Sequence, residues 1–178
     1  YKDSVRRLLS ISKTNLEVGK HLRGALADIV STEQRYETAI ETAFGGAMQN
    51  IVTPTADDAR YLIEYLKRTG GGVVTFLPVA SMRPRPATRE IKRALDERGA
   101  MGLADELVKY DEYYYNVISN LLGNTLVCDN IANATTIAKK YGNVFRIVTL
   151  DGDVVATSGS MTGGSRGKNV GSLLSGER

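Results

Sequence analysis

Hydrophobic residues recur at helical spacing from the start of this chain of 178 residues. Tyr1, Val5 and Leu8 fall on one face of a helix, and charged residues lie between them. Leu16 follows Leu9 by seven positions, so the apolar stripe is expected to continue to Leu16. Because the pattern is already in phase at the first residue, we expect this helix to be longer in a parent protein.

The body of the chain repeats itself after a shift of 78 positions. Five pairs of residues are identical at this shift: Gly24 and Gly102, Val30 and Val108, Tyr36 and Tyr114, Ile40 and Ile118, and Gly45 and Gly123. Conservative pairs fill the positions between them with the same helical phase. The sequence therefore predicts two copies of one structural unit.

Each copy has the same expected order of elements. A short helix and a second helix, ended by Gly45 or Gly123 as a C-cap, precede an apolar strand, a third helix and a closing strand. In the first copy the helices are expected at 25–30, 33–44 and 55–67, and the strands at 49–53 and 73–77. In the second copy the helices are expected at 103–109, 111–122 and 132–140, and the strands at 125–128 and 144–148.

The segments outside the two copies have turn and cap signals of their own. Asp151-Gly152 between apolar runs predicts a hairpin into 154–156. Two prolines make 82–86 a loop, and a polar helix capped by Thr88 should follow it to residue 98. A further helix is expected at 170–174. The predicted fold class is mixed α/β (α+β), with two pseudo-repeated lobes that contain small sheets and flanking helices.

Composition and charge exclude several classes of protein. Hydrophobic residues make up 42% and charged residues 24%, as in a folded globular domain. No apolar run is long enough to cross a bilayer, and the absence of a leader indicates an excised or processed chain. A net charge of +3 permits contact with nucleic acid without requiring it. One cysteine excludes an internal disulfide and fits a reducing, cytoplasmic compartment.

Few residues form a pattern that is typical of a catalytic, nucleotide-binding or metal-binding site. The glycine-rich segment 163–169 resembles a phosphate loop, but Thr162 and Asn169 stand where that motif needs Gly and Ser or Thr. We interpret these glycines as sites of close backbone approach between strands or across an interface, with a flexible exit loop as the alternative. His21 is expected to be solvated or partly packed, and Cys128 to be a core residue. No metal site and no cofactor are predicted.

Several charged and aromatic groups have two interpretations. Adjacent acidic pairs, such as Asp57 with Asp58, fit the first turn of a helix better than an acid/base pair. Tyr110 and Tyr113–Tyr115 fit packing between the copies, or a stacking platform for nucleic acid. The basic run between 83 and 93 fits a solvated face or a phosphate contact. A second basic set flanks the two ends of the body and would gather if those ends converge: Lys20, Arg23, Arg166 and Lys168.

Taken together, several segments resemble the hinge domain of structural maintenance of chromosomes (SMC) proteins, in its bacterial, homodimeric form. These segments are 22–30, 36–52, 75–78, 124–129, 148–155 and 160–165, so the resemblance covers about residues 19–166. It implies that 1–18 is the end of an incoming coiled-coil arm and that 166–178 begins the outgoing arm. Lobe one with its connecting loop and helix would span 19–98, and lobe two 99–165.

The resemblance also implies a function. The hinge would join two arms of an SMC ATPase for chromosome condensation and segregation, associated with the nucleoid. The ATPase heads, with their accessory subunits, would lie elsewhere, so this fragment would not be an enzyme and would have no catalytic residue. Each lobe would pair a strand edge with the other lobe of a second copy. The implied interface residues are Val154, Val155, Gly159, Met161, Gly163 and Gly164.

The basic ends add an expected weak, sequence-independent contact with DNA, through the four cations named above. Two alternatives come from the residues alone. Alternating helices and strands permit an enzyme or a small-ligand-binding domain with a site between the lobes, although no polar group has catalytic spacing. A stand-alone nucleic-acid reader is disfavoured by the small net charge and the lack of a recognition motif.

Overall fold

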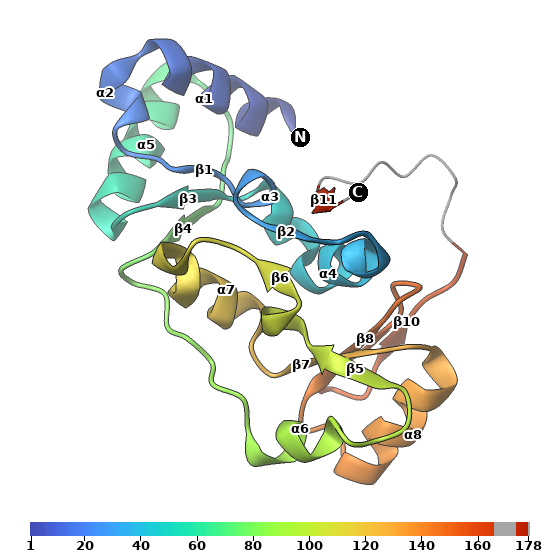
Figure 1. Ribbon diagram of the computed structural model, residues 1–178. Helices are drawn as coiled ribbons and strands as arrows, with labels where there is room; N and C mark the ends of the chain where they lie inside the picture. The colour runs from blue at the N-terminus through green and yellow to red at the C-terminus, as the bar shows by residue number, and fades with distance from the viewer. Residues whose placement is uncertain (166–173, 178) are drawn as a thin grey trace.

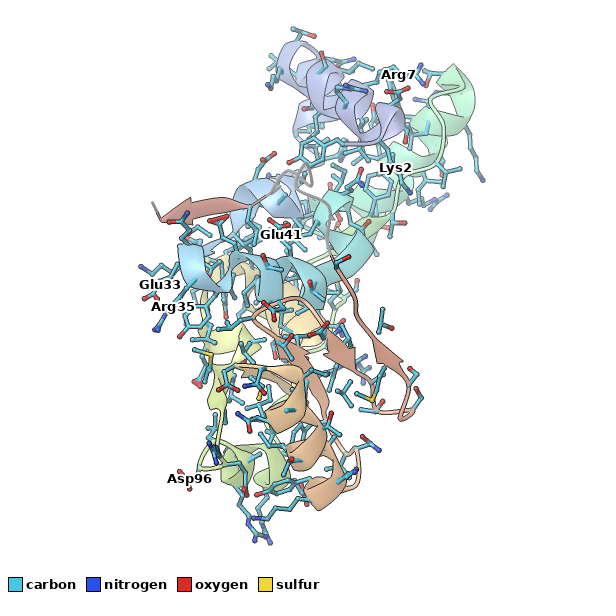
Figure 2. All side chains as sticks on the ribbon, turned by 90° about the vertical axis from the view of Figure 1, so that its right-hand side faces the viewer. Lys2, Arg7, Glu33, Arg35, Glu41 and Asp96 are labelled. Atoms are coloured by element: carbon cyan, nitrogen blue, oxygen red, sulfur yellow. The ribbon has the colours of Figure 1, made fainter. Side chains whose placement is uncertain are left out.

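The computed structural model describes residues 1–165 and 174–177 of the chain. Two lobes lie at opposite ends of an elongated molecule, and a central layer joins them (Figure 1). Arg7 in the first lobe and Asp96 in the second mark these ends (Figure 2). No helix among the described residues is both long and apolar enough to span a membrane.

The first lobe is built on a three-stranded sheet in the order β1-β3-β4. β1 runs antiparallel to β3, and β4 runs parallel to it. The elements of this half are α1 (Asp3–Thr14), α2 (Leu16–Gly19), β1 (Gly24–Ala25), α3 (Leu26–Ile29), β2 (Ser31–Glu33), η1 (Gln34–Tyr36), α4 (Glu37–Phe44), η2 (Gly45–Gln49), β3 (Ile51–Thr53), α5 (Ala56–Thr69) and β4 (Phe76–Pro78).

The second lobe has the same arrangement plus a hairpin. Its sheet has the order β10-β9-β8-β7-β5, with β7 and β8 parallel and the other pairs antiparallel. The elements are α6 (Arg89–Ala94), β5 (Ala100–Leu103), η3 (Ala104–Glu106), β6 (Val108–Lys109), η4 (Glu112–Tyr114), α7 (Tyr115–Leu122), β7 (Thr125–Cys128), α8 (Ile131–Tyr141), β8 (Arg146–Thr149), β9 (Val154–Val155) and β10 (Met161–Thr162). The Asp151-Gly152 hairpin joins β8 to β9 as predicted.

The predicted internal repeat is confirmed by the order and position of the elements. η1 and α4 coincide with η4 and α7 at the shift of 78 positions. β2 pairs antiparallel with its own counterpart β6, and Ser31 lies opposite Lys109, its equivalent in the second copy. The two lobes are therefore related by an approximate two-fold axis through this pair. β11 (Ser175–Glu177) pairs in parallel with the other edge of β2.

A shared core fills the space between the lobes. Ile40 of α4 and Ile118 of α7 are both fully buried in it, and the two helices pack against each other. Leu26, Leu122 and Val127 belong to the same cluster. Because both copies contribute side chains to one core, neither lobe completes its packing alone.

The first helix packs on the first lobe. Val5 and Leu8 of α1 are buried against Leu62 and Leu66 of α5. The stripe ends earlier than expected, because Leu16 is 85% exposed. The Asn15 side chain accepts hydrogen bonds from the amides of the next turn and starts a separate short helix, α2.

The connecting helix α6 packs on the lobe that follows it. Thr88 caps it as predicted, and Ile91 and Ala94 lie fully buried beside Leu126 and Ile137 in the core of the second lobe. The helix ends at Ala94, earlier than expected.

Some expected element boundaries are wrong for local reasons. Val73 is 88% exposed, and the closing strand of the first copy starts only at Phe76. Gly123 does not end α7 in a left-handed conformation, since its φ is −57° and Asn124 takes the positive φ instead. A Cβ at Gly123 would collide with the carbonyl oxygens of Ser119 and Arg85, so the glycine allows a close approach of two backbones. Leu174, the described end of the helix expected at 170–174, is a bend, and the rest of that helix lies outside the described residues.

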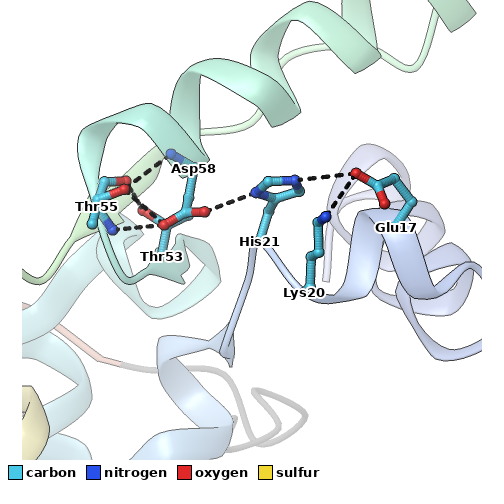
Figure 3. Close-up of polar contacts among 6 residues, drawn as sticks. All are labelled: Glu17, Lys20, His21, Thr53, Thr55 and Asp58. Carbon is cyan, nitrogen blue, oxygen red and sulfur yellow. Dashed lines mark hydrogen bonds and ion pairs between the residues drawn. The ribbon is translucent and has the colours of Figure 1, made fainter.

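His21 connects the N-terminus of α5 with α2 (Figure 3). Thr55 and Asp58 form a capping box at the N-terminus of α5. The Nδ1 atom of His21 lies 2.7 Å from an oxygen of Asp58, and its ring stacks on Tyr61 with centroids 3.9 Å apart. Nε2 of the same ring faces Glu17 of α2 at 3.9 Å. The side chain is only 17% exposed, so His21 is partly packed, one of the two predicted states.

This contact changes the acidity of Asp58. Burial raises its pKa, but hydrogen bonds from His21 and Thr55 outweigh burial and hold the pKa below its ordinary value of 3.8. A carboxyl group with a lowered pKa in the folded state stabilises the fold above the pKa of the unfolded chain. That stabilisation is lost as the pH falls through the folded-state pKa.

Replacing Asp58 should therefore destabilise the chain in a pH-dependent way. Asp58→Ala removes the capping box and the His21 contact, and we expect the free energy of unfolding to fall by about 1 kcal/mol at neutral pH. The difference from wild type should begin to shrink below about pH 4, where the unfolded chain takes up the proton, and should be lost once the pH falls through the lower folded-state pKa. Urea unfolding at several pH values measures both effects. Asp57→Ala, in the same helical turn but exposed, is the control; equal losses in the two variants would contradict this role.

Candidate functional site

Each lobe's sheet has two edge strands: β1 and β4 in the first lobe, and β5 and β10 in the second. The two lobes differ at the β4 and β10 edges. β8 of the second lobe is covered by β9, and β10 covers β9 in turn. β4 occupies the place of β8 in the first lobe, yet it pairs with β3 alone, because the described part of that lobe has no counterpart of the hairpin. β4 and β10 thus each have one strand neighbour within the described chain. Open strand edges are the places where a sheet accepts another strand.

The hydrogen-bond pattern shows which residues turn outward at these edges. The amide of Ala156 donates to the carbonyl oxygen of Ser160, so alternate residues of β10 face β9 and Met161 turns its backbone groups away. On β4, the carbonyl oxygen of Thr75 and the amide of Val79 bond to β3. Phe76 therefore turns its backbone away from β3.

The side chains predicted at the interface lie in different environments. Met161 is 52% exposed, and the segment 158–165 around it is exposed throughout. Val154 is half-buried against the shared core. Val155 is 3% exposed and packs inside its own lobe, so its side chain is not available to a partner. β9, which contains both valines, is an inner strand and not an edge.

At each of the three glycines predicted at the interface, the backbone conformation or the available space within this chain already favours glycine. Gly159 has a φ of +90° in the turn between β9 and β10, and Gly164 has a φ of +144°. A Cβ at Gly163 would collide with the carboxylate of Asp153, which hydrogen-bonds to the Thr149 hydroxyl at 3.0 Å. Alanine at these positions would therefore disturb the chain itself as well as any partner contact.

The structure describes half of the predicted basic set. Lys20 and Arg23 lie between α2 and β1, whereas Arg166 and Lys168 lie outside the described residues. The ammonium group of Lys20 pairs with Glu17 at 3.0 Å. The Arg23 guanidinium lies 5.9 Å from the centroid of the Tyr113 ring. Convergence of the four cations stays a prediction.

Of the four tyrosines at 110 and 113–115, two pack in the core and two are exposed. Tyr110 and Tyr114 pack against the core shared by the two copies, as expected. Tyr113 and Tyr115 are each 45% exposed, and the Tyr113 ring meets Tyr114 edge-on at 4.9 Å. The two exposed rings lie on opposite sides of Tyr114 in sequence.

Cys128 and the acidic pair Asp57 and Asp58 have structural roles. Cys128 is fully buried, and burial raises the pKa of its thiol, which disfavours the reactive thiolate. Asp57 and Asp58 lie in the first turn of α5, as the acidic pair was expected to do. Burial, with a contribution from Glu106, raises the pKa of Asp105. Across residues 1–165 and 174–177, no three His, Cys, Asp or Glu side chains gather as metal ligands.

Comparison with known proteins agrees with these features. The family described as "SMC proteins Flexible Hinge Domain" matches residues 19–138. The chromosome partition protein Smc of Bacillus subtilis is 46% identical over 154 residues, which is 86% of this chain and 13% of that protein. Smc of Methanocaldococcus jannaschii is 41% identical over 161 residues, with 88% and 13% covered. The chain thus spans about an eighth of the length of these relatives.

Solved structures of hinge domains have the same fold. The hinge of Geobacillus stearothermophilus SMC, solved as an asymmetric dimer, matches with a TM-score of 0.87 and 39% identity, covering 98% of this chain and 68% of that one. The Pyrococcus furiosus SMC hinge matches with a TM-score of 0.70 and 25% identity, covering 96% of each chain. The repeated lobes, the sequence relatives and these structures agree, and the chain belongs to the SMC hinge family.

Proposed function

We propose that this domain is the homodimerisation hinge of a chromosome partition protein, where two coiled-coil arms are joined. The observation that carries the proposal is that equivalent sides of the two sheets end differently, in β4 in the first lobe and in the added hairpin strand β10 in the second. Two equivalent lobes that end in different edges offer two complementary surfaces on one chain.

Pairing of β10 with β4 of a second copy would complete the sheet of the first lobe. The added strand would take the place that β9 takes beside β8 in the second lobe. A two-fold axis would create this contact twice, so β4 and β10 of both copies would be covered in a closed dimer. The second contact would form within an already associated pair, which raises its effective concentration.

The arms and the boundaries follow from the same proposal. Residues 1–18 would end the incoming arm, and 19–98 would form the first lobe with its connecting loop and helix, although that helix, α6, packs on the second lobe. Residues 99–165 would form the second lobe, and 166–178 would begin the outgoing arm. Burial of Val5 and Leu8 against α5 supports a firm attachment of the incoming helix to the first lobe. ATP hydrolysis and accessory subunits would belong to distant heads of the parent protein, in the cytoplasm and at the nucleoid.

The hinge would also bind DNA weakly and without sequence preference. Lys20 and Arg23, together with Arg166 and Lys168, would neutralise backbone phosphates near the junction with the arms. The exposed ring of Tyr113 beside Arg23 supports this location, because it holds the guanidinium at the surface. Such binding would weaken steeply with salt, because each neutralised phosphate releases counterions.

Blocking the outward edge of β10 should prevent dimerisation. Met161→Pro removes the amide that faces away from β9, so we expect it to shift the chain from dimer to monomer in sedimentation velocity at micromolar concentration. Met161→Leu keeps the amide and an apolar side chain and should remain dimeric. Thermal unfolding checks that the proline variant is folded. A folded Met161→Pro variant that remains fully dimeric would exclude this edge as the interface.

Removing the two described cations should reduce the salt dependence of DNA binding. For Lys20→Gln with Arg23→Gln, we expect the slope of log affinity against log salt to become shallower by about 0.9 for each duplex phosphate that the variant no longer neutralises. Fluorescence anisotropy with a duplex at several salt concentrations measures the slope. Lys67→Gln, an exposed lysine near the opposite end of α5, is the control. An unchanged slope in the double variant would contradict a role for these residues.

A further inference from the structure

A cavity in the second lobe has two arginines in its wall. Its volume is about 400 Å³, and it lies where the end of α7 meets the start of β8. Arg146, the first residue of β8, and Arg85, in the loop before α6, both line it. This place belongs to the second lobe, whereas Lys20 and Arg23 precede the sheet of the first.

Arg146 is held only by neutral groups. Its Nε and Nη2 atoms donate to the Thr125 hydroxyl at 3.2 and 3.0 Å, and Nη2 also donates to the carbonyl oxygen of Leu121 at 3.3 Å. Nη1 has no hydrogen-bond partner among the described residues, and none of their carboxylates pairs with Arg146 or Arg85. Burial lowers the pKa of Arg146, and the charge of Arg85 lowers it further.

A partly buried cation without a counterion is unfavourable unless a negative charge comes to it. The helix carbonyl of Leu121 and the Thr125 hydroxyl orient the guanidinium but do not neutralise it. A second guanidinium on the same cavity adds repulsion that an anion between the two would relieve. The arrangement is thus more suited to holding an anion than to stabilising the fold.

Asn124 adds a neutral donor to the same wall. Its Oδ1 atom accepts hydrogen bonds from the amide and the hydroxyl of Thr88, both at 3.1 Å. Because a backbone amide can only donate, the side-chain oxygen must face Thr88, and the Nδ2 group is left for another acceptor. The positive φ of Asn124, 59°, places this residue at the end of α7 beside the cavity.

We propose that Arg85, Asn124 and Arg146 form a binding site for an oxyanion of the phosphate class. The planar guanidinium of Arg85 can donate two parallel hydrogen bonds to phosphate oxygens. Arg146 would donate through its Nη1 group and Asn124 through its Nδ2 group. The cavity is larger than one phosphate group, so the ligand is either a small free phosphate compound or a phosphate of a DNA backbone. The site rests on this chain's own residues and does not require the proposed dimer.

Titration with inorganic phosphate at constant ionic strength tests the site. In ¹H–¹⁵N spectra of the 178-residue chain, we expect saturable shifts of the Arg146 Nε–Hε signal and of the amides of residues 123–125. Sodium chloride of equal ionic strength should not produce them. A linear response, or the same response to chloride, would overturn the proposal.

Variants identify the residues responsible. Arg85 is exposed in a loop, so Arg85→Gln should fold normally and weaken phosphate binding roughly 10-fold or more, since a charged hydrogen-bond donor is removed. Arg89→Gln removes an equal charge from an exposed side chain at the start of α6, outside the cavity, and should leave the affinity within about twofold. Arg146→Gln should abolish binding, with thermal unfolding as the check on its fold. Wild-type affinity in Arg85→Gln would overturn the assignment.

A second titration distinguishes the sources of the phosphate. If DNA supplies it, phosphate should displace a duplex more than chloride of equal ionic strength does, and Arg85→Gln should bind DNA more weakly than Arg89→Gln. If a free compound supplies it, saturable phosphate binding should persist with no such displacement. A change of molar mass in Arg85→Gln with an unchanged phosphate response would instead indicate that a partner's carboxylate meets these arginines, and would overturn the proposal.

Discussion

The antiparallel pairing of β2 with β6 is the contact on which the arrangement of this domain depends. Ser31 and Lys109 are equivalent residues of the two copies, and they lie opposite each other in that ladder. The equivalent helices α4 and α7 pack on each other, with Ile40 and Ile118 fully buried between the lobes. A duplicated sequence that pairs with itself in this way fixes the two lobes in one orientation and gives them a common core.

The approximate symmetry of the two lobes is broken at the edge strands β4 and β10. The hairpin of β9 and β10 extends only the sheet of the second lobe, so one lobe ends in β10 and the other in β4. An exact repeat would offer two identical edges, whereas this chain offers two different edges, which under the proposed function pair with each other across two copies. A cavity at the start of β8 is lined by both Arg85 and Arg146.

The repeat and most elements could be predicted from the sequence because apolar spacing and cap residues are local signals. The boundaries of η1 with α4 and of η4 with α7 follow the pattern around Tyr36 and Tyr114 closely. Burial of Val155 and the close approach of Gly123 to the backbone of Arg85 depend on neighbours distant in sequence. The early end of the stripe before Leu16 is local, because Asn15 caps a new helix there. The cavity lined by Arg146 could not be predicted either, because a single arginine in an apolar strand does not indicate which residues surround it. The open edges were expected only through the family resemblance.

The central claim is that β4 and β10 close a dimer of this chain, and amide hydrogen exchange tests it most directly. Exchange measured by mass spectrometry across a dilution series should show protection in peptides that contain residues 74–77 and 160–163, growing with concentration as the dimer forms. Peptides from the buried pair β2 and β6 should remain equally protected throughout. A dimer that forms without added protection at both edges would contradict the account.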